Sequence, residues 1–153
     1  MPDVNRWIGG AANAVQVDDV TPANVENTDI FKITLADDAG NSNEISFTAT
    51  AGTVQNVVEG LQTLAAAAKA AGTAPWTAVT VTDDDTKVII TSDTSGVPFD
   101  VTTSTVDGGG TDDQTLVRSV STARSSADDW KVVANWSLGA IPVATDIVVF
   151  EDS

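Results

Sequence analysis

The sequence predicts an α+β domain, in which a mostly antiparallel β-sheet or sandwich carries one packed helix and is flanked by extended N- and C-terminal segments. The first observation is a series of short segments in which apolar and β-branched residues alternate with polar ones, as in half-buried strands. The second is a change to helical spacing of the apolar residues over residues 53–71. Strands on each side of a single helix are typical of the α+β class.

Six strands are expected in the central part of the chain. Residues 36–41 join the first two and have the Asp, Gly and Asn content of a hairpin connection, while Ile45 and Phe47 share one face of the second strand. Residues 83–86 join a second hairpin, and a glycine-rich loop at residues 108–110 precedes the last strand. The expected strands cover residues 29–35, 44–50, 77–82, 87–91, 97–103 and 114–120.

The helix is expected over about residues 53–71. Thr53 is a suitable N-cap, because its hydroxyl can accept a hydrogen bond from the first helical turn. Lys69 lies in the last turn, Gly72 suits the left-handed residue that follows a helix, and Pro75 prevents continuation. The apolar stripe includes Val54, Val57, Val58, Leu61, Leu64, Ala65 and Ala68, and it should pack on a sheet.

A chain of 153 residues can bury one sizeable core, so we expect one body with an extension on each side. Residues 1–20 should form an N-terminal arm, and residues 21–122 the α+β body. Residues 123–153 should form a tryptophan-containing C-terminal segment with a terminal strand, because Asp146-Ile-Val-Val-Phe150 is rich in β-branched and aromatic residues.

Composition argues against several classes of function. The 22 acidic and seven basic residues give a formal charge of −15, which repels nucleic acids and anionic membrane surfaces, so neither is an expected partner. No segment is long and apolar enough for a membrane span, and the first residues lack a secretory pattern, so synthesis in a cytoplasm is expected. Without Cys or His, thiol chemistry and the commonest general base are missing, and we predict that the protein is not an enzyme and has no cofactor.

Two aspartates at the tip of the second expected hairpin, Asp83 and Asp85, are the candidate metal ligands. Carboxylate oxygens suit calcium, but the spacing of ligands in a calcium-binding loop is missing here. Aspartate is also favoured at hairpin tips for backbone reasons alone. We therefore predict turn chemistry at this tip and no bound metal.

Two stretches of the sequence carry a resemblance to known proteins. Residues 28–103, above all the phrase Gly96-Val-Pro-Phe-Asp-Val101, are similar to a module common in tailed-bacteriophage virion proteins. The phrase Asn135-Trp-Ser-Leu-Gly139, followed by Pro142 and Asp146, is similar to a segment of large surface and virion proteins. The resemblance implies a non-enzymatic structural protein that decorates or anchors on the capsid or tail.

The same resemblance implies a location and partners. The chain is expected in the virion, after assembly in the cytoplasm of a bacterial host. Its expected partners are other virion proteins, namely the major capsid protein or a tail protein, and further copies of itself, with a homo-trimer as the first expectation.

Assembly is expected to use both terminal segments. In the arm, Trp7 and Ile8 are candidate contacts, and the alternative for Trp7 is burial in the chain's own core. A terminal strand needs a partner, which lies either earlier in this chain or on another chain. The resemblance implies that the strand joins a neighbour's sheet, to which an edge strand would bind through its backbone groups, or that it leads into a domain absent from this chain. The candidates in this strand are Ile147, Val148, Val149 and Phe150.

A carbohydrate-binding surface module is the alternative function. Trp130 and Trp136 lie six residues apart, and a pair of exposed, coplanar indoles could stack on sugar rings. The competing interpretation is that both indoles fill a junction in the fold, because tryptophan buries a large area and anchors interfaces.

Overall fold

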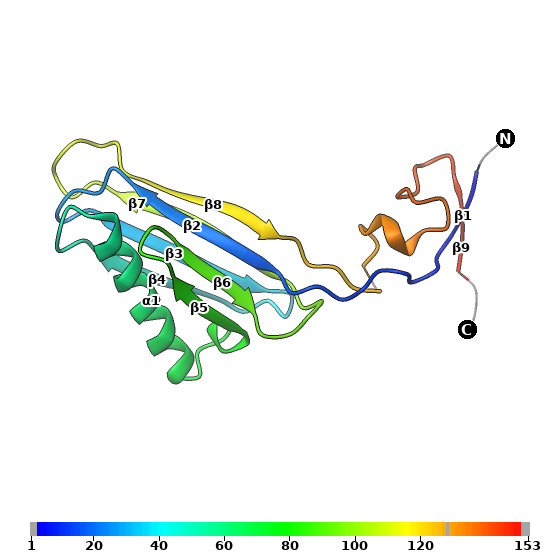
Figure 1. The fold of residues 1–153 in the computed structure, drawn as a ribbon, viewed down its shortest axis with the longest axis horizontal. Helices are drawn as coiled ribbons and strands as arrows, with labels where there is room; N and C mark the ends of the chain where they lie inside the picture. The colour runs from blue at the N-terminus through cyan, green and yellow to red at the C-terminus, as the bar shows by residue number, and fades with distance from the viewer. Residues whose placement is uncertain (1–2, 128, 151–153) are drawn as a thin grey trace.

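The computed structural model describes residues 3–127 and 129–150, which form an elongated molecule with two lobes (Figure 1). The larger lobe is a body of two β-sheets and one helix, and the smaller lobe contains both ends of the described chain. We call the smaller lobe the terminal unit and define it as residues 3–14, 125–127 and 129–150. The predicted α+β class, mostly antiparallel with a single helix, is confirmed.

The body contains a four-stranded sheet in the order β5-β6-β2-β8 and a three-stranded sheet in the order β4-β3-β7. All neighbours within these sheets are antiparallel. The elements are β2 (Val17–Ala23), β3 (Ile30–Asp37), β4 (Ser42–Thr48), α1 (Val54–Ala70), β5 (Val79–Asp83), β6 (Val88–Ser92), β7 (Phe99–Val106) and β8 (Thr115–Thr122).

Both predicted hairpins are present, and their turns use the expected side chains. In the β3–β4 turn, the Asp37 carboxylate accepts hydrogen bonds from the backbone N–H and the side-chain amide of Asn41, at 2.9 and 2.8 Å. In the β5–β6 turn, the Asp84 carboxylate accepts from the backbone N–H groups of Thr86 and Lys87, at 3.1 and 3.0 Å. Local hydrogen bonding therefore determines both turns.

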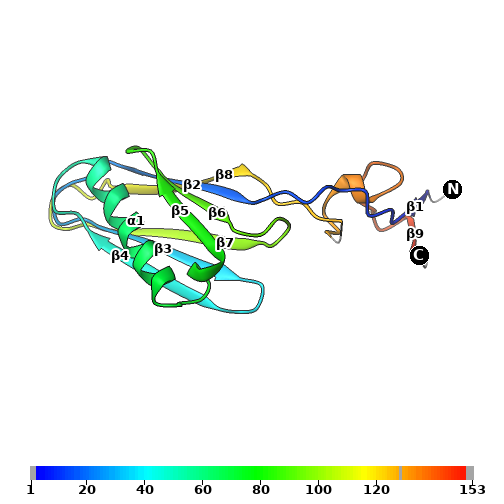
Figure 2. The same cartoon turned by 60° about the horizontal axis from the view of Figure 1, so that its bottom comes forward.

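The predicted helix is confirmed as α1. Thr53 caps it by accepting a hydrogen bond from the backbone N–H of Asn56 at 3.3 Å, and Gly72 follows its end with a φ of 73°. The helix packs against β4 and β5, which are edge strands of the two different sheets (Figure 2). It therefore closes one side of the space between the sheets.

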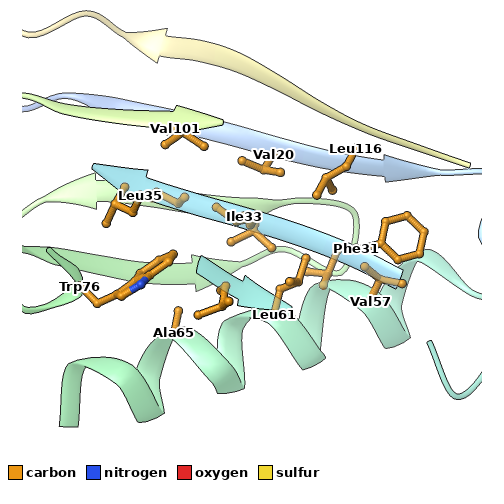
Figure 3. Close-up of a cluster of buried hydrophobic side chains, with 14 of the residues drawn as sticks. Val20, Phe31, Ile33, Leu35, Val57, Leu61, Ala65, Trp76, Val101 and Leu116 are labelled. Atoms are coloured by element: carbon orange, nitrogen blue, oxygen red, sulfur yellow. The ribbon is translucent and has the colours of Figure 1, made fainter. Parts of the chain in front are cut away.

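The opposite side is closed by the edge strands β7 and β8. The Thr103 hydroxyl donates to the Leu116 carbonyl at 2.7 Å, and Arg118 donates to the Val101 carbonyl at 3.1 Å. Figure 3 shows the apolar side chains that meet in the interior. Those labelled are Val20, Phe31, Ile33, Leu35, Val57, Leu61, Ala65, Trp76, Val101 and Leu116, and all belong to one buried cluster.

Strand β2 has no counterpart among the six expected strands. It begins at Val17, inside the segment expected as an arm, and pairs with both β6 and β8. Its sequence, VDDVTPA, does not predict a central strand, because two aspartates and a proline are unusual in one. Asp18 is fully buried there and is compensated by Arg118, whose Nη2 lies 2.9 Å from the carboxylate.

Candidate assembly site: the terminal unit

Residues from the two ends of the described chain form a small parallel sheet. Strand β1 (Val4–Arg6) pairs with β9 (Ile147–Val149), the strand expected near the C-terminus. The N–H of Ile147 donates to the Asp3 carbonyl, and the N–H of Trp7 donates to the Val149 carbonyl, both at 2.9 Å. At this edge, the chain's own N-terminal segment therefore replaces the neighbouring chain expected from the resemblance.

Two buried asparagines connect the N-terminal segment to the C-terminal segment. The Asn5 side chain donates to the Ala140 carbonyl at 2.7 Å. Asn135 is 0% exposed, and its side-chain oxygen accepts from the N–H of Ala11 at 2.8 Å. The Asn135 amide nitrogen also donates to the carbonyls of Ser126 and Asp129, each at 2.8 Å. Polar contacts therefore hold the two segments in one arrangement.

Four aromatic side chains form the apolar centre of the terminal unit. Trp7 meets Trp136 edge-on at a centroid distance of 5.0 Å and lies nearly parallel to Trp130 at 6.2 Å. Phe150 joins them at 5.9 Å from Trp130. Trp7 therefore packs within its own chain, which was the alternative to an arm that docks elsewhere.

The two indoles proposed as a sugar platform have different environments. Trp136 is 1% exposed, and its indole N–H donates to the Trp130 carbonyl at 2.9 Å. Trp130 is 45% exposed, and its ring stands at 80° to that of Trp136. The pair therefore lacks the exposed, coplanar arrangement that stacking on a sugar requires.

The outer surface of the terminal unit is rich in apolar side chains. The body, although much longer, exposes only four large apolar side chains, Val97, Val106, Val117 and Val120, among the described residues. Gathered apolar surface of this kind marks interaction sites. The terminal unit exposes nine: Val4, Ile8, Trp130, Val133, Leu138, Ile141, Val143, Ile147 and Phe150.

The residues that the sequence predicts as assembly contacts all lie in the terminal unit. Ile8 is exposed, while its N–H donates to the Asn135 carbonyl at 2.8 Å. Ile147 and Phe150 are exposed, and Val148 and Val149 are half-buried. The structure thus brings the candidates of both terminal segments together within one chain.

Searches with the sequence and the structure found no matching protein-family model, no matching curated protein and no matching solved structure. Within residues 3–127 and 129–150, no helix has both the length and the apolar character needed to cross a membrane. The features of this chain that bear on function are therefore the physical ones of the terminal unit.

The acidic hairpin tip is a turn held by hydrogen bonds of its own aspartates. The Asp83 carboxylate accepts a hydrogen bond from the N–H of Asp85 at 3.3 Å, and Asp85 has a left-handed φ of 67°. In the described part of the chain, no group of three or more acidic side chains is placed to hold a metal ion. The aspartates at this tip therefore have an evident role in the turn itself.

Sequence reasoning named the aromatic residues of the terminal unit but missed strand β1 and the buried asparagines that hold the unit together. Asn5 and Asn135 lie in short, irregular stretches, where no periodicity marks them as buried. Strand β1 has only three residues, too few for an alternating pattern. Their roles depend on contacts between segments more than 120 positions apart, which local sequence patterns do not report.

Proposed function

We propose that this protein is a non-enzymatic structural subunit of a tailed-bacteriophage particle, which attaches to its neighbours through the terminal unit. The partners would be the major capsid protein or a tail protein, and further copies of the chain. The motif resemblance in residues 28–103 and 135–146 supports the type of particle. The physical features of the terminal unit support the mode of attachment.

One observation carries the proposal: the exposed apolar side chains gather on the terminal unit, around strand β9, whose outer edge has no pairing strand among the described residues. Covering these side chains would remove apolar surface from water, which favours association by about 25 cal/mol for each Å². Backbone groups at the open edge add directional hydrogen bonds.

The body would act as a rigid spacer. Strands β2 and β8 are continued by the two segments that connect the body to the terminal unit, and their pairing is extended by a bridge between Ala14 and Ser125 (Figure 1). The N–H of Ala14 donates to the Ser125 carbonyl at 2.8 Å. A two-stranded connection of this kind restricts the orientation of the body once the terminal unit is attached.

The test is co-sedimentation of the full chain with purified heads and tails of the phage that encodes it. Ile147→Lys places a charge on the terminal unit, where the isoleucine is 48% exposed. Val117→Lys is the matched control, because Val117 is 58% exposed on a body strand. We expect Ile147→Lys to weaken binding at least about tenfold, equivalent to about 1.4 kcal/mol, and Val117→Lys to bind like the wild type.

Two results would contradict the proposal. The first is wild-type protein that stays in the supernatant with both heads and tails. The second is an equal loss of binding to the particles in Ile147→Lys and Val117→Lys, which would place the contact on the body. Retention on immobilised glycans that Trp130→Ala abolishes, without any binding to particles, would favour the carbohydrate-binding alternative.

A further inference from the structure

The open edge of β9 carries a pair of backbone groups that point away from β1. In the parallel ladder, Ile147 and Val149 face β1, as their hydrogen bonds to Asp3 and Trp7 show. Backbone groups alternate in direction along a strand, so the N–H and C=O of Val148 point to the other edge. The two-stranded sheet has no further strand there among the described residues.

Each of the other sheet edges in the described chain has another element or a hydrogen-bonding group against it. Helix α1 packs against β4 and β5, and Lys69 donates to the Val79 carbonyl at 2.7 Å. Strands β7 and β8 close on each other through hydrogen bonds such as that from Thr103 to Leu116. The free side of β1 is taken by Ser137, whose N–H donates to the Arg6 carbonyl at 2.9 Å.

Strand β9 has three residues, and such shortness itself limits edge pairing, but the strand lacks the other features that normally prevent it. Natural edge strands are protected by lysine, proline, a bulge or a covering element. The sequence of β9 is Ile-Val-Val, and its register with β1 is regular. Exposed apolar side chains flank it, among them Val4, Ile147 and Phe150.

We propose that β9 pairs in antiparallel orientation with β9 of a second copy of this chain, across a two-fold axis at Val148. The Val148 N–H of each copy would donate to the Val148 carbonyl of the other, and the two small sheets would join into one of the order β1-β9-β9-β1. The inference rests on the proposed assembly function and names its self-association contact.

Self-complementarity favours a second copy as the occupant. An outward N–H and C=O on one central residue are satisfied by the same residue of a two-fold-related strand, with no further sequence requirement. Pairing across a two-fold axis closes at two copies. The inference therefore replaces, at this edge, the homo-trimer expected from the resemblance with a dimer.

The decisive experiment uses Val148→Cys in the full chain. Directly opposed residues in a hydrogen-bonded antiparallel pair have Cα atoms about 5.5 Å apart, within the range of about 4.4–6.8 Å that a disulfide bridges. The wild-type chain contains no cysteine, so a covalent dimer reports position 148 alone. The matched control is Val117→Cys, at an exposed valine on a body strand.

We expect the wild-type chain to sediment as a dimer and Val148→Cys to form a covalent dimer under mild oxidation. Val117→Cys should form little covalent dimer. Val148→Pro, which removes the outward N–H, should weaken the dimer at least tenfold, whereas Val148→Ala, which keeps it, should not. Because both copies carry a charge of −15, added salt should tighten the dimer by screening their repulsion.

Three outcomes overturn the inference: a wild-type chain that stays monomeric up to about 1 mM, a discrete trimer, or a dimer in which Val148→Cys does not cross-link. Failure of this inference and of the proposed function are distinguishable. A monomer that still co-sediments with phage heads or tails rejects only the self-association, and a cross-linked dimer that binds neither rejects only the role in the particle.

Discussion

Gly60 of α1 lies against the ring of Phe47 on β4, so close that a β-carbon on Gly60 would stand 2.3 Å from Phe47 Cε2. The helix therefore approaches the sheet over a position without a side chain. This contact explains a glycine in the interior of a helix, where the residue is otherwise unfavourable by about 1 kcal/mol relative to alanine.

We expect Gly60→Ala to lower the free energy of unfolding by about 1 kcal/mol, because the displaced Phe47 ring outweighs the gain in helix propensity. Urea unfolding followed by circular dichroism measures the change. In a Phe47→Leu background the same substitution should be neutral or stabilising. Equal destabilisation in both backgrounds would show that the ring is not the cause.

Asn135→Ala should unfold the terminal unit while the body remains folded. The substitution removes the partner of the Ala11 N–H and of the Ser126 and Asp129 carbonyls, and a buried polar group left without its partner costs about 1–3 kcal/mol. Amide NMR spectra distinguish the two lobes. Asn13→Ala, at an exposed asparagine of the same unit, is the control and should leave both sets of resonances unchanged.

The two neighbouring tryptophans should differ in their contribution to stability. Trp136→Ala removes a buried indole, for which losses of about 3–5 kcal/mol are typical, and should disorder the terminal unit. Trp130→Ala removes a half-exposed ring and should have a smaller effect. Near-ultraviolet circular dichroism follows the aromatic cluster. If the aromatic cluster kept its near-ultraviolet signal in Trp136→Ala, that result would contradict the central position of Trp136.

Acid should weaken the four-stranded sheet through Asp19. Burial alone raises the pKa of Asp19, but hydrogen bonds from Lys87, which precedes β6, and from Ser121 on β8 outweigh burial and lower the pKa below its ordinary value. A depressed pKa in the folded state means that the unfolded state binds the proton first. The stabilisation is therefore complete above about pH 4 and is lost as the pH falls further.

Asp19→Asn tests this dependence. The variant should be less stable than the wild type at neutral pH by about 1 kcal/mol, and the difference should shrink below about pH 4. Urea midpoints measured at several pH values give the comparison. Asp38→Asn, at an exposed aspartate beside the β3–β4 turn, is the control. A difference that stays constant in acid would exclude the ion pair with Lys87 as its source.

The sequence by itself determined the elements that depend on near neighbours. The stripe of Val57, Leu61 and Ala65 repeats at helical spacing, so it predicts α1 whatever the helix packs against. Alternation and turn residues likewise predicted the β3–β4 and β5–β6 hairpins, whose partners follow directly in the chain.

The tertiary structure decided which distant segments meet. It placed the aspartate-bearing β2 at the centre of a sheet, where Arg118 on β8 compensates the buried Asp18. It also paired β1 with β9 and enclosed Asn135 between the two terminal segments. A periodic pattern records which face of an element is apolar, but the partner of a short strand or a buried amide is chosen by long-range packing and hydrogen bonding.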